Sequence, residues 1–143
     1  MKTRDQLLAE IAWQKVQQHQ QHQDKNMLSH VCKEASARIL TSGLLPTLAF
    51  SLAKGAAEGN EPNVVAHRHL GEALTALIAE RFPHQGRQIG NIEQSLQSLI
   101  ERDADLLRRA TEEASALLGW MGRFADGLDG NDRNQLLQEG EAQ

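Results

Sequence analysis

The sequence contains few of the residues on which disulfide-bonded or membrane-spanning proteins depend. Only one of its 143 residues is a cysteine, Cys32, so an intramolecular disulfide is excluded and a reducing compartment is expected. Tyrosine is absent, and aromatic residues make up only 3% of the chain. No apolar run approaches the roughly 20 residues that a membrane-spanning helix needs. We therefore expect no membrane association and no stabilisation by disulfides.

Signals for secretion and for catalysis are also missing. The first ten residues lack the apolar segment of a signal peptide, which predicts a cytoplasmic protein. There is no glycine-rich phosphate loop, no G-x-S-x-G and no H-E-x-x-H. His67 and His69, two residues apart, face different sides of a helix, and His19 and His22 have no third ligand nearby. The sequence predicts a protein that is not an enzyme and has no bound metal or cofactor, with Cys32 as an inert buried thiol.

What the chain has in abundance is helix formers, chiefly Ala, Leu, Gln and Glu. Apolar residues recur every three or four positions, which is typical of one buried helix face. Thr3 and Gln6 form a capping-box pair, and Gly43 is suited to end a helix. The stretch beginning near Leu45 is apolar on more than one side, so we expect that helix to be central. The predicted helices cover about 4–23, 26–41, 45–54, 64–82, 92–101 and 103–128.

These stretches predict an all-α, single-domain bundle of about five to six helices. The helical domain occupies residues 1–128, and residues 129–143 form an acidic tail that we expect to be flexible. The formal net charge is −4, and most of it comes from this tail. Because the rest of the chain is nearly neutral, overall charge neither supports nor excludes a polyanionic partner. Only a local patch of cations would indicate one.

The cations that form such a patch come from two separate segments. Lys33, Arg38 and Lys54 flank the predicted turn at Gly43, and Arg108, Arg109 and Arg123 lie on the last helix. If the helices pack so that these side chains meet, the patch can engage a phosphate backbone. In the alternative interpretation, these cations only keep the protein soluble, and several form ion pairs with acidic residues four positions away in the same helix. The expected pairs are Glu34 with Arg38, Arg108 with Glu112, and Arg109 with Glu113.

Trp120 lies on the same side of the last helix as Arg109 and Arg123. On an exposed helix face, a tryptophan between two arginines is typical of a protein-binding hot spot. The pattern therefore leaves two interpretations open, an RNA-binding face and a protein interface centred on Trp120.

Three separated stretches resemble one family, the small helical subunit of the type III-B CRISPR RNA-guided effector, the Cmr complex. The first is 9-AEIAWQKV-16, the second is 37-ARILTSGLLPTLAF-50, and the third is 107-LRRATEEASALLGWMGRFADGL-128. In the third, residues from Arg108 to Ala125 follow the family's order and spacing. Gly122 is a departure, because the family has a basic residue there.

The resemblance implies a non-catalytic subunit that stacks in several copies along the effector and helps to hold guide and target RNA in antiviral defence. Its partners would be the other effector subunits, neighbouring copies of itself, and the RNA backbone, bound weakly and without sequence preference. The alternative is a helical protein–protein interaction module with no direct contact to nucleic acid. Salt-dependent RNA retention separates the two hypotheses.

Overall fold

The structure is a computed structural model that describes residues 1–20 and 25–141, with side chains described for 1–20 and 26–128. Over these residues it contains six α-helices and no strand, which confirms the predicted all-α single domain. The expected continuation of the first helix over 21–23 lies outside the described residues. The helices are α1 (Arg4–Gln20), α2 (Lys25–Ser42), α3 (Leu44–Gly55), α4 (Pro62–Arg81), α5 (Ile92–Glu101) and α6 (Ala104–Glu141).

Local hydrogen bonds explain where the helices begin and end. The predicted capping box is present, because the Gln6 amide donates to Thr3 Oγ1 at 3.1 Å and the Thr3 amide donates to Gln6 Oε1 at 2.8 Å. Gly43 has a φ of 94°, a conformation that glycine adopts without strain, and it separates α2 from α3. Asp103 accepts a hydrogen bond from the Leu106 amide at 2.8 Å and thereby starts α6 immediately after α5.

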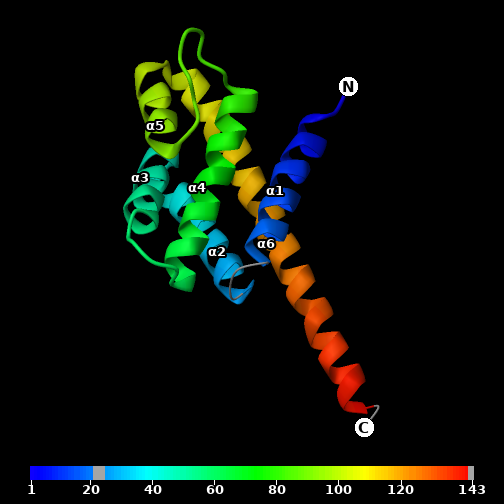
Figure 1. Cartoon of the computed structure of the whole chain (residues 1–143). Helices are drawn as coiled ribbons and strands as arrows, with labels where there is room; N and C mark the ends of the chain where they lie inside the picture. The colour runs from blue at the N-terminus through cyan, green and yellow to red at the C-terminus, as the bar shows by residue number, and fades with distance from the viewer. Residues whose placement is uncertain (21–24, 142–143) are drawn as a thin grey trace.

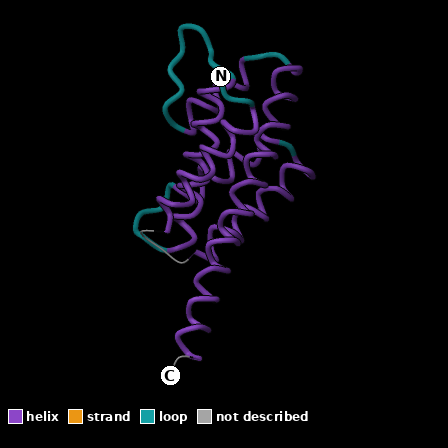
Figure 2. The backbone as a smooth tube through the Cα atoms, turned by 90° about the vertical axis from the view of Figure 1, so that its right-hand side faces the viewer, coloured by secondary structure: helices purple, strands orange, loops and turns teal. Residues whose placement is uncertain are grey.

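The core lies where α1, α2 and α4 meet the first part of α6 (Figures 1 and 2). The helix α6 contributes an apolar stripe whose members are at most 3% exposed: Ala110, Ala114, Leu117, Leu118, Met121 and Ala125. The most buried helix is α4 rather than α3, which corrects the expectation that the third helix is central. Buried histidines and Thr75 make the sequence of α4 less apolar, so its pattern does not identify α4 as the central helix.

The last helix is much longer than the others and extends beyond the bundle (Figure 1). Its 38 residues correspond to a length of about 57 Å. Its backbone remains helical from Leu128 to residue 141, through most of the segment expected to be a tail. The flexibility of that segment stays a prediction. None of the helices, over the described residues, is long and apolar enough to cross a membrane.

Cys32 lies in the core on α2 with none of its surface exposed. Burial, together with the charge of Asp126, raises the pKa of its thiol to about 12. We therefore expect the native protein to resist alkylation by iodoacetamide at pH 8 and to react fully once it is unfolded in guanidinium chloride. Mass spectrometry of the two samples measures the difference. Rapid labelling of the native protein would show that Cys32 is accessible.

Candidate nucleic-acid interface

Two of the six predicted cations meet on one aromatic ring. The turn at Gly43 brings α2 and α3 together, so that Arg38 from α2 and Lys54 from α3 both contact Phe50. The Arg38 Cζ lies 3.5 Å and the Lys54 Nζ 5.6 Å from the ring centroid. Within the described part of the chain, neither cation has a carboxylate partner. We call Arg38, Phe50 and Lys54 the Phe50 cluster.

A buried histidine lies behind the Phe50 cluster. The His67 ring packs edge-on against Phe50 with the centroids 5.5 Å apart, and His67 is only 3% exposed. Its Nδ1 is buried without a hydrogen-bond partner among the described residues. Burial lowers the pKa of His67, and the nearby charges of Arg38 and Lys54 lower it further, against an opposing effect of Glu34. A neutral His67 therefore supports the ring without adding a third positive charge.

The other predicted cations are arranged differently. Lys33 lies 3.1 Å from Asp126 on α6, so it joins α2 to α6 and is separated from the Phe50 cluster. Arg108 pairs with Asp105 at 2.9 Å and, as predicted, with Glu112 at 3.0 Å. These exposed pairs are weak, but they partly neutralise the positive charge that a phosphate would meet. The structure therefore does not gather the six cations into one patch.

Two of the expected helical pairs are wrong. Glu34 lies 3.0 Å from His30 rather than beside Arg38, which is stacked on Phe50 instead. Glu113 is 8% exposed, because it faces α4, where it accepts hydrogen bonds from Arg81 at 2.7 and 3.4 Å.

Arg109, which was expected to pair with Glu113, lies 3.5 Å from Asp105. In both wrong pairs, one member contacts a side chain from another helix instead of its neighbour four residues away. Arg38 stacks on Phe50 of α3, and Glu113 bonds Arg81 of α4.

A second surface surrounds Trp120. Trp13 from α1 packs edge-on against Phe124 from α6 with the ring centroids 5.2 Å apart, and Trp120 lies 5.6 Å from the same ring. The Arg123 guanidinium lies 5.9 Å from the Trp120 ring. We call these four residues the aromatic patch. Trp13 is 41% exposed. Sequence reasoning therefore found Trp120 but missed its two aromatic neighbours.

A buried histidine pair was also missed. His19 and His69 bring their Nδ1 atoms within 2.9 Å of each other, and both rings are nearly inaccessible to solvent. The pair joins the end of α1 to α4. His67 and His69 do face different neighbours, as their spacing predicted. Over the described residues, no group of three His, Cys, Asp or Glu side chains is placed to hold a metal ion.

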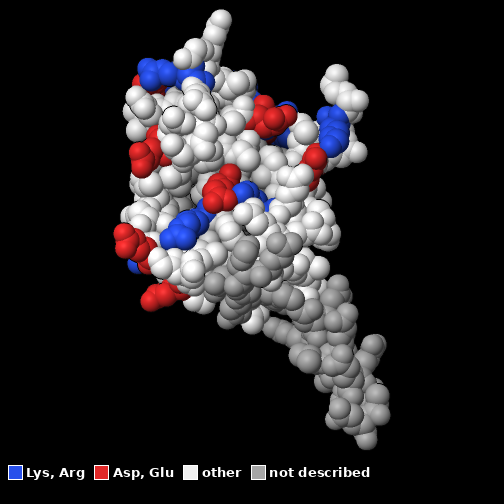
Figure 3. Space-filling view, viewed as in Figure 1, with Lys and Arg blue, Asp and Glu red and all other residues white. Residues whose placement is uncertain are grey.

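The charges outside these two surfaces are mixed. On the face shown in Figure 3, acidic and basic residues alternate and do not form a continuous field of one sign. The fold and these surfaces, over the described residues, define a small all-α protein with two groups of aromatic and cationic side chains. Its distinguishing features are the aromatic patch and the Phe50 cluster, in which Arg38 and Phe50 are half-buried and Lys54 is exposed.

Comparison with known families agrees with this class and gives it a name. The family model described as CRISPR-associated protein (Cas_Cmr5) matches residues 4–128. The chain therefore belongs to the CRISPR-associated Cmr5 family, which supplies a small subunit of the Cmr complex in CRISPR defence. This match confirms the family that the three sequence stretches indicated.

A solved structure supports the same fold. The X-ray crystal structure of a CRISPR-associated Cmr5 family protein from Thermus thermophilus matches this chain with a TM-score of 0.67. The match covers 90% of this chain and 98% of that chain at 23% sequence identity. At this level of identity, the likeness establishes the shared fold.

The state of His67 predicts how stability changes with pH. Because the folded protein lowers the pKa of His67, the unfolded chain takes up a proton at a higher pH, near 6.5. The stability is therefore complete above pH 6.5 and decreases as the pH falls below it. We expect His67→Leu to show a smaller loss between pH 7 and 5 in urea unfolding. The exposed His30, changed to Gln, is the control, and equal slopes for His67→Leu and wild type would exclude this role.

Proposed function

We propose that this chain is a non-catalytic small subunit of the type III-B effector that stacks in several copies and contacts guide and target RNA through the Phe50 cluster. Family membership supports its place in the Cmr complex. The observation that carries the RNA contact is the pair Arg38 and Lys54, which share one aromatic ring and lack a carboxylate partner among the described residues. Such cations remain available to phosphate oxygens.

The geometry favours weak binding without sequence preference. The Phe50 ring holds the Arg38 guanidinium and thereby reduces the entropy that the side chain loses on binding a phosphate. Two cations neutralise about two phosphates, so the affinity of one subunit is low and falls as salt rises. Several copies along one strand would add their contacts and bind much more strongly than one. Arg108 and Arg109 contribute less in this proposal, because Asp105 pairs with both.

A second function, protein–protein interaction, is favoured by a different observation. The aromatic patch combines Trp13, Trp120, Phe124 and an arginine, the residue types that dominate binding energy in protein interfaces. We therefore assign Trp120 to a protein contact, and this assignment is compatible with RNA binding elsewhere on the subunit. The RNA-binding hypothesis thus concerns the Phe50 cluster, and the protein-interaction hypothesis concerns the aromatic patch.

The RNA contact is tested with the double variant Arg38→Glu/Lys54→Glu. We expect it to incorporate into the reconstituted effector and to retain less target RNA than wild type. Loss of two phosphate contacts should reduce the slope of log affinity against log salt by about 2 for the free subunit. Filter binding over a range of salt concentrations measures this slope. The matched control is Arg4→Glu/Arg87→Glu, which makes the same charge change at two exposed, ion-paired arginines.

Two results would contradict the proposal. One is equal retention and equal salt dependence for wild type and the Arg38→Glu/Lys54→Glu variant. The other is an equal loss in the Arg4→Glu/Arg87→Glu control, which would mean that total charge rather than the Phe50 cluster determines binding. Helix content from circular dichroism shows whether each variant is folded before RNA binding is compared.

A further inference from the structure

One titratable group lies beside the proposed RNA contact without taking part in it. His67 from α4 packs edge-on against Phe50 with the ring centroids 5.5 Å apart. Arg38 and Lys54 lie against the same ring, at 3.5 and 5.6 Å from its centroid. A charge on His67 would therefore act on the two cations and on any phosphate that they hold.

The His67 ring is free to take up a proton. Its Nδ1 is buried without a hydrogen-bond partner, and within the described residues no hydrogen bond holds the ring in the neutral state. A neutral imidazole carries one N–H and one lone pair, so the nitrogen without the hydrogen can accept a proton. Protonation of His67 would therefore break no hydrogen bond with another described residue.

The charged groups that act on His67 come from two other helices. Burial lowers the pKa of His67, and Glu34 from α2 raises it. Arg38 from α2 and Lys54 from α3 lower the pKa, because they repel the imidazolium. In the free subunit, the cations that attract RNA thus help to keep His67 neutral.

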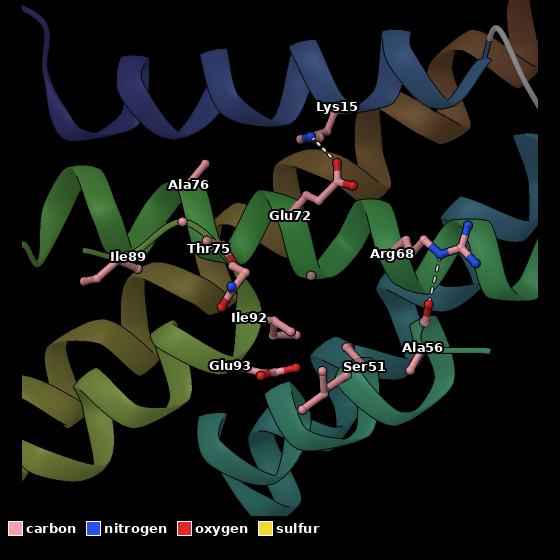
Figure 4. Close-up of a pocket in the computed structure, with 15 residues that line it drawn as sticks. Lys15, Ser51, Ala56, Arg68, Glu72, Thr75, Ala76, Ile89, Ile92 and Glu93 are labelled. Carbon is pink, nitrogen blue, oxygen red and sulfur yellow. Dashed lines mark hydrogen bonds and ion pairs between the residues drawn. The ribbon is translucent and has the colours of Figure 1, made fainter. Parts of the chain in front are cut away.

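A further cation, Arg68, follows His67 on α4 but is held at a different place. Its guanidinium donates to the carbonyl oxygens of Gly55 at 2.9 Å and Ala57 at 2.7 Å. Figure 4 shows Arg68 reaching from α4 toward the end of α3. Because these bonds fix its position, we attribute the response of His67 to RNA to Arg38 and Lys54.

A phosphate at the Phe50 cluster would change the charges around His67 but not its burial. The negative charge of the phosphate offsets that of Arg38 and Lys54, so the repulsion of the imidazolium decreases. Because His67 is only 3% exposed, RNA can remove little further water from it. Bound RNA therefore favours the protonated ring, and by linkage the protonated ring favours bound RNA to the same extent.

We propose that RNA binding at the Phe50 cluster is coupled to proton uptake by His67, so that the subunit holds RNA more tightly in mildly acidic than in neutral solution. This inference rests on the proposed RNA contact and names a proton as the regulator of that site. His67 is buried, so it acts on the phosphate through its charge rather than by contact.

The sign of the pH dependence follows from the two states of the subunit. The free subunit lowers the pKa of His67 below the ordinary value of 6.5, and bound RNA moves that pKa back upward. RNA binding therefore takes up protons, and the affinity rises as the pH falls below 6.5. The increase ends where the free subunit is protonated as well.

Titration of the His67 ring in the full-length protein tests the coupling directly. We expect nuclear magnetic resonance at low salt to give a higher midpoint pH for the His67 ring protons with a short oligouridine than without it. The variant His67→Leu identifies the signal. His84, which lies 3.4 Å from Ser98 of α5, is the internal control. An unchanged His67 midpoint with RNA bound, or an equal shift for His67 and His84, would overturn the proposal.

Affinity gives a second readout. We expect wild type to bind the oligouridine about threefold more tightly at about pH 5.5 than at about pH 7.5, and His67→Leu to lose most of this difference. Filter binding measures the affinities, and circular dichroism at each pH shows that the protein is folded. His84→Gln is the matched control and should behave as wild type. A full pH dependence in His67→Leu would assign the effect to other groups and contradict the coupling.

The coupling and the RNA contact fail in different ways. If Arg38→Glu/Lys54→Glu binds RNA as well as wild type, the RNA contact is wrong and the coupling is wrong with it. If that variant loses RNA binding while RNA leaves the His67 midpoint of wild type unchanged, only the coupling is wrong. A midpoint that rises with RNA in wild type but not in Arg38→Glu/Lys54→Glu would support both.

Discussion

The close packing of α6 against α1 and α2 determines where the aromatic patch lies. Ala110, Ala114 and Ala125 in the buried stripe of α6 have small side chains, which let neighbouring backbones approach closely. A larger residue in such a tightly packed position costs about 1–3 kcal/mol. Because this stripe faces inward, Trp120 and Arg123 emerge beside α1, where Trp13 meets Phe124. The aromatic patch is therefore a direct consequence of how the core packs.

The Phe50 cluster is formed at a different helix junction from the aromatic patch. Arg38 and Lys54 meet at Phe50 because α2 and α3 are joined by the turn at Gly43. A pocket of about 720 Å³ is formed where α3, α4 and α5 converge, and its lining carries both Arg68 and Glu93. The Phe50 cluster, with its two cations, and the pocket, with its mixed charges, therefore lie at different helix junctions.

The sequence was sufficient to predict the helices, because periodicity and caps such as Thr3 with Gln6 are local properties. It was insufficient for contacts between helices. Glu113 pairs with Arg81, 32 residues away, and Arg38 stacks on Phe50, because side chains from adjacent helices compete with neighbours in the same helix. The cations and Trp120 could be selected from their residue types, whereas Trp13 and the pocket depend on which helices lie side by side.

The hydrogen bond between His19 of α1 and His69 of α4 limits which ring nitrogens can carry a proton. With the Nδ1 atoms of His19 and His69 2.9 Å apart, one ring must donate its N–H while the other offers a lone pair. The two rings are therefore opposite tautomers when both are neutral, and one of them can accept an additional proton without losing the bond. A second added proton would leave two donors facing each other and turn an attraction into a repulsion. The junction of α1 and α4 thus tolerates one extra proton but not two.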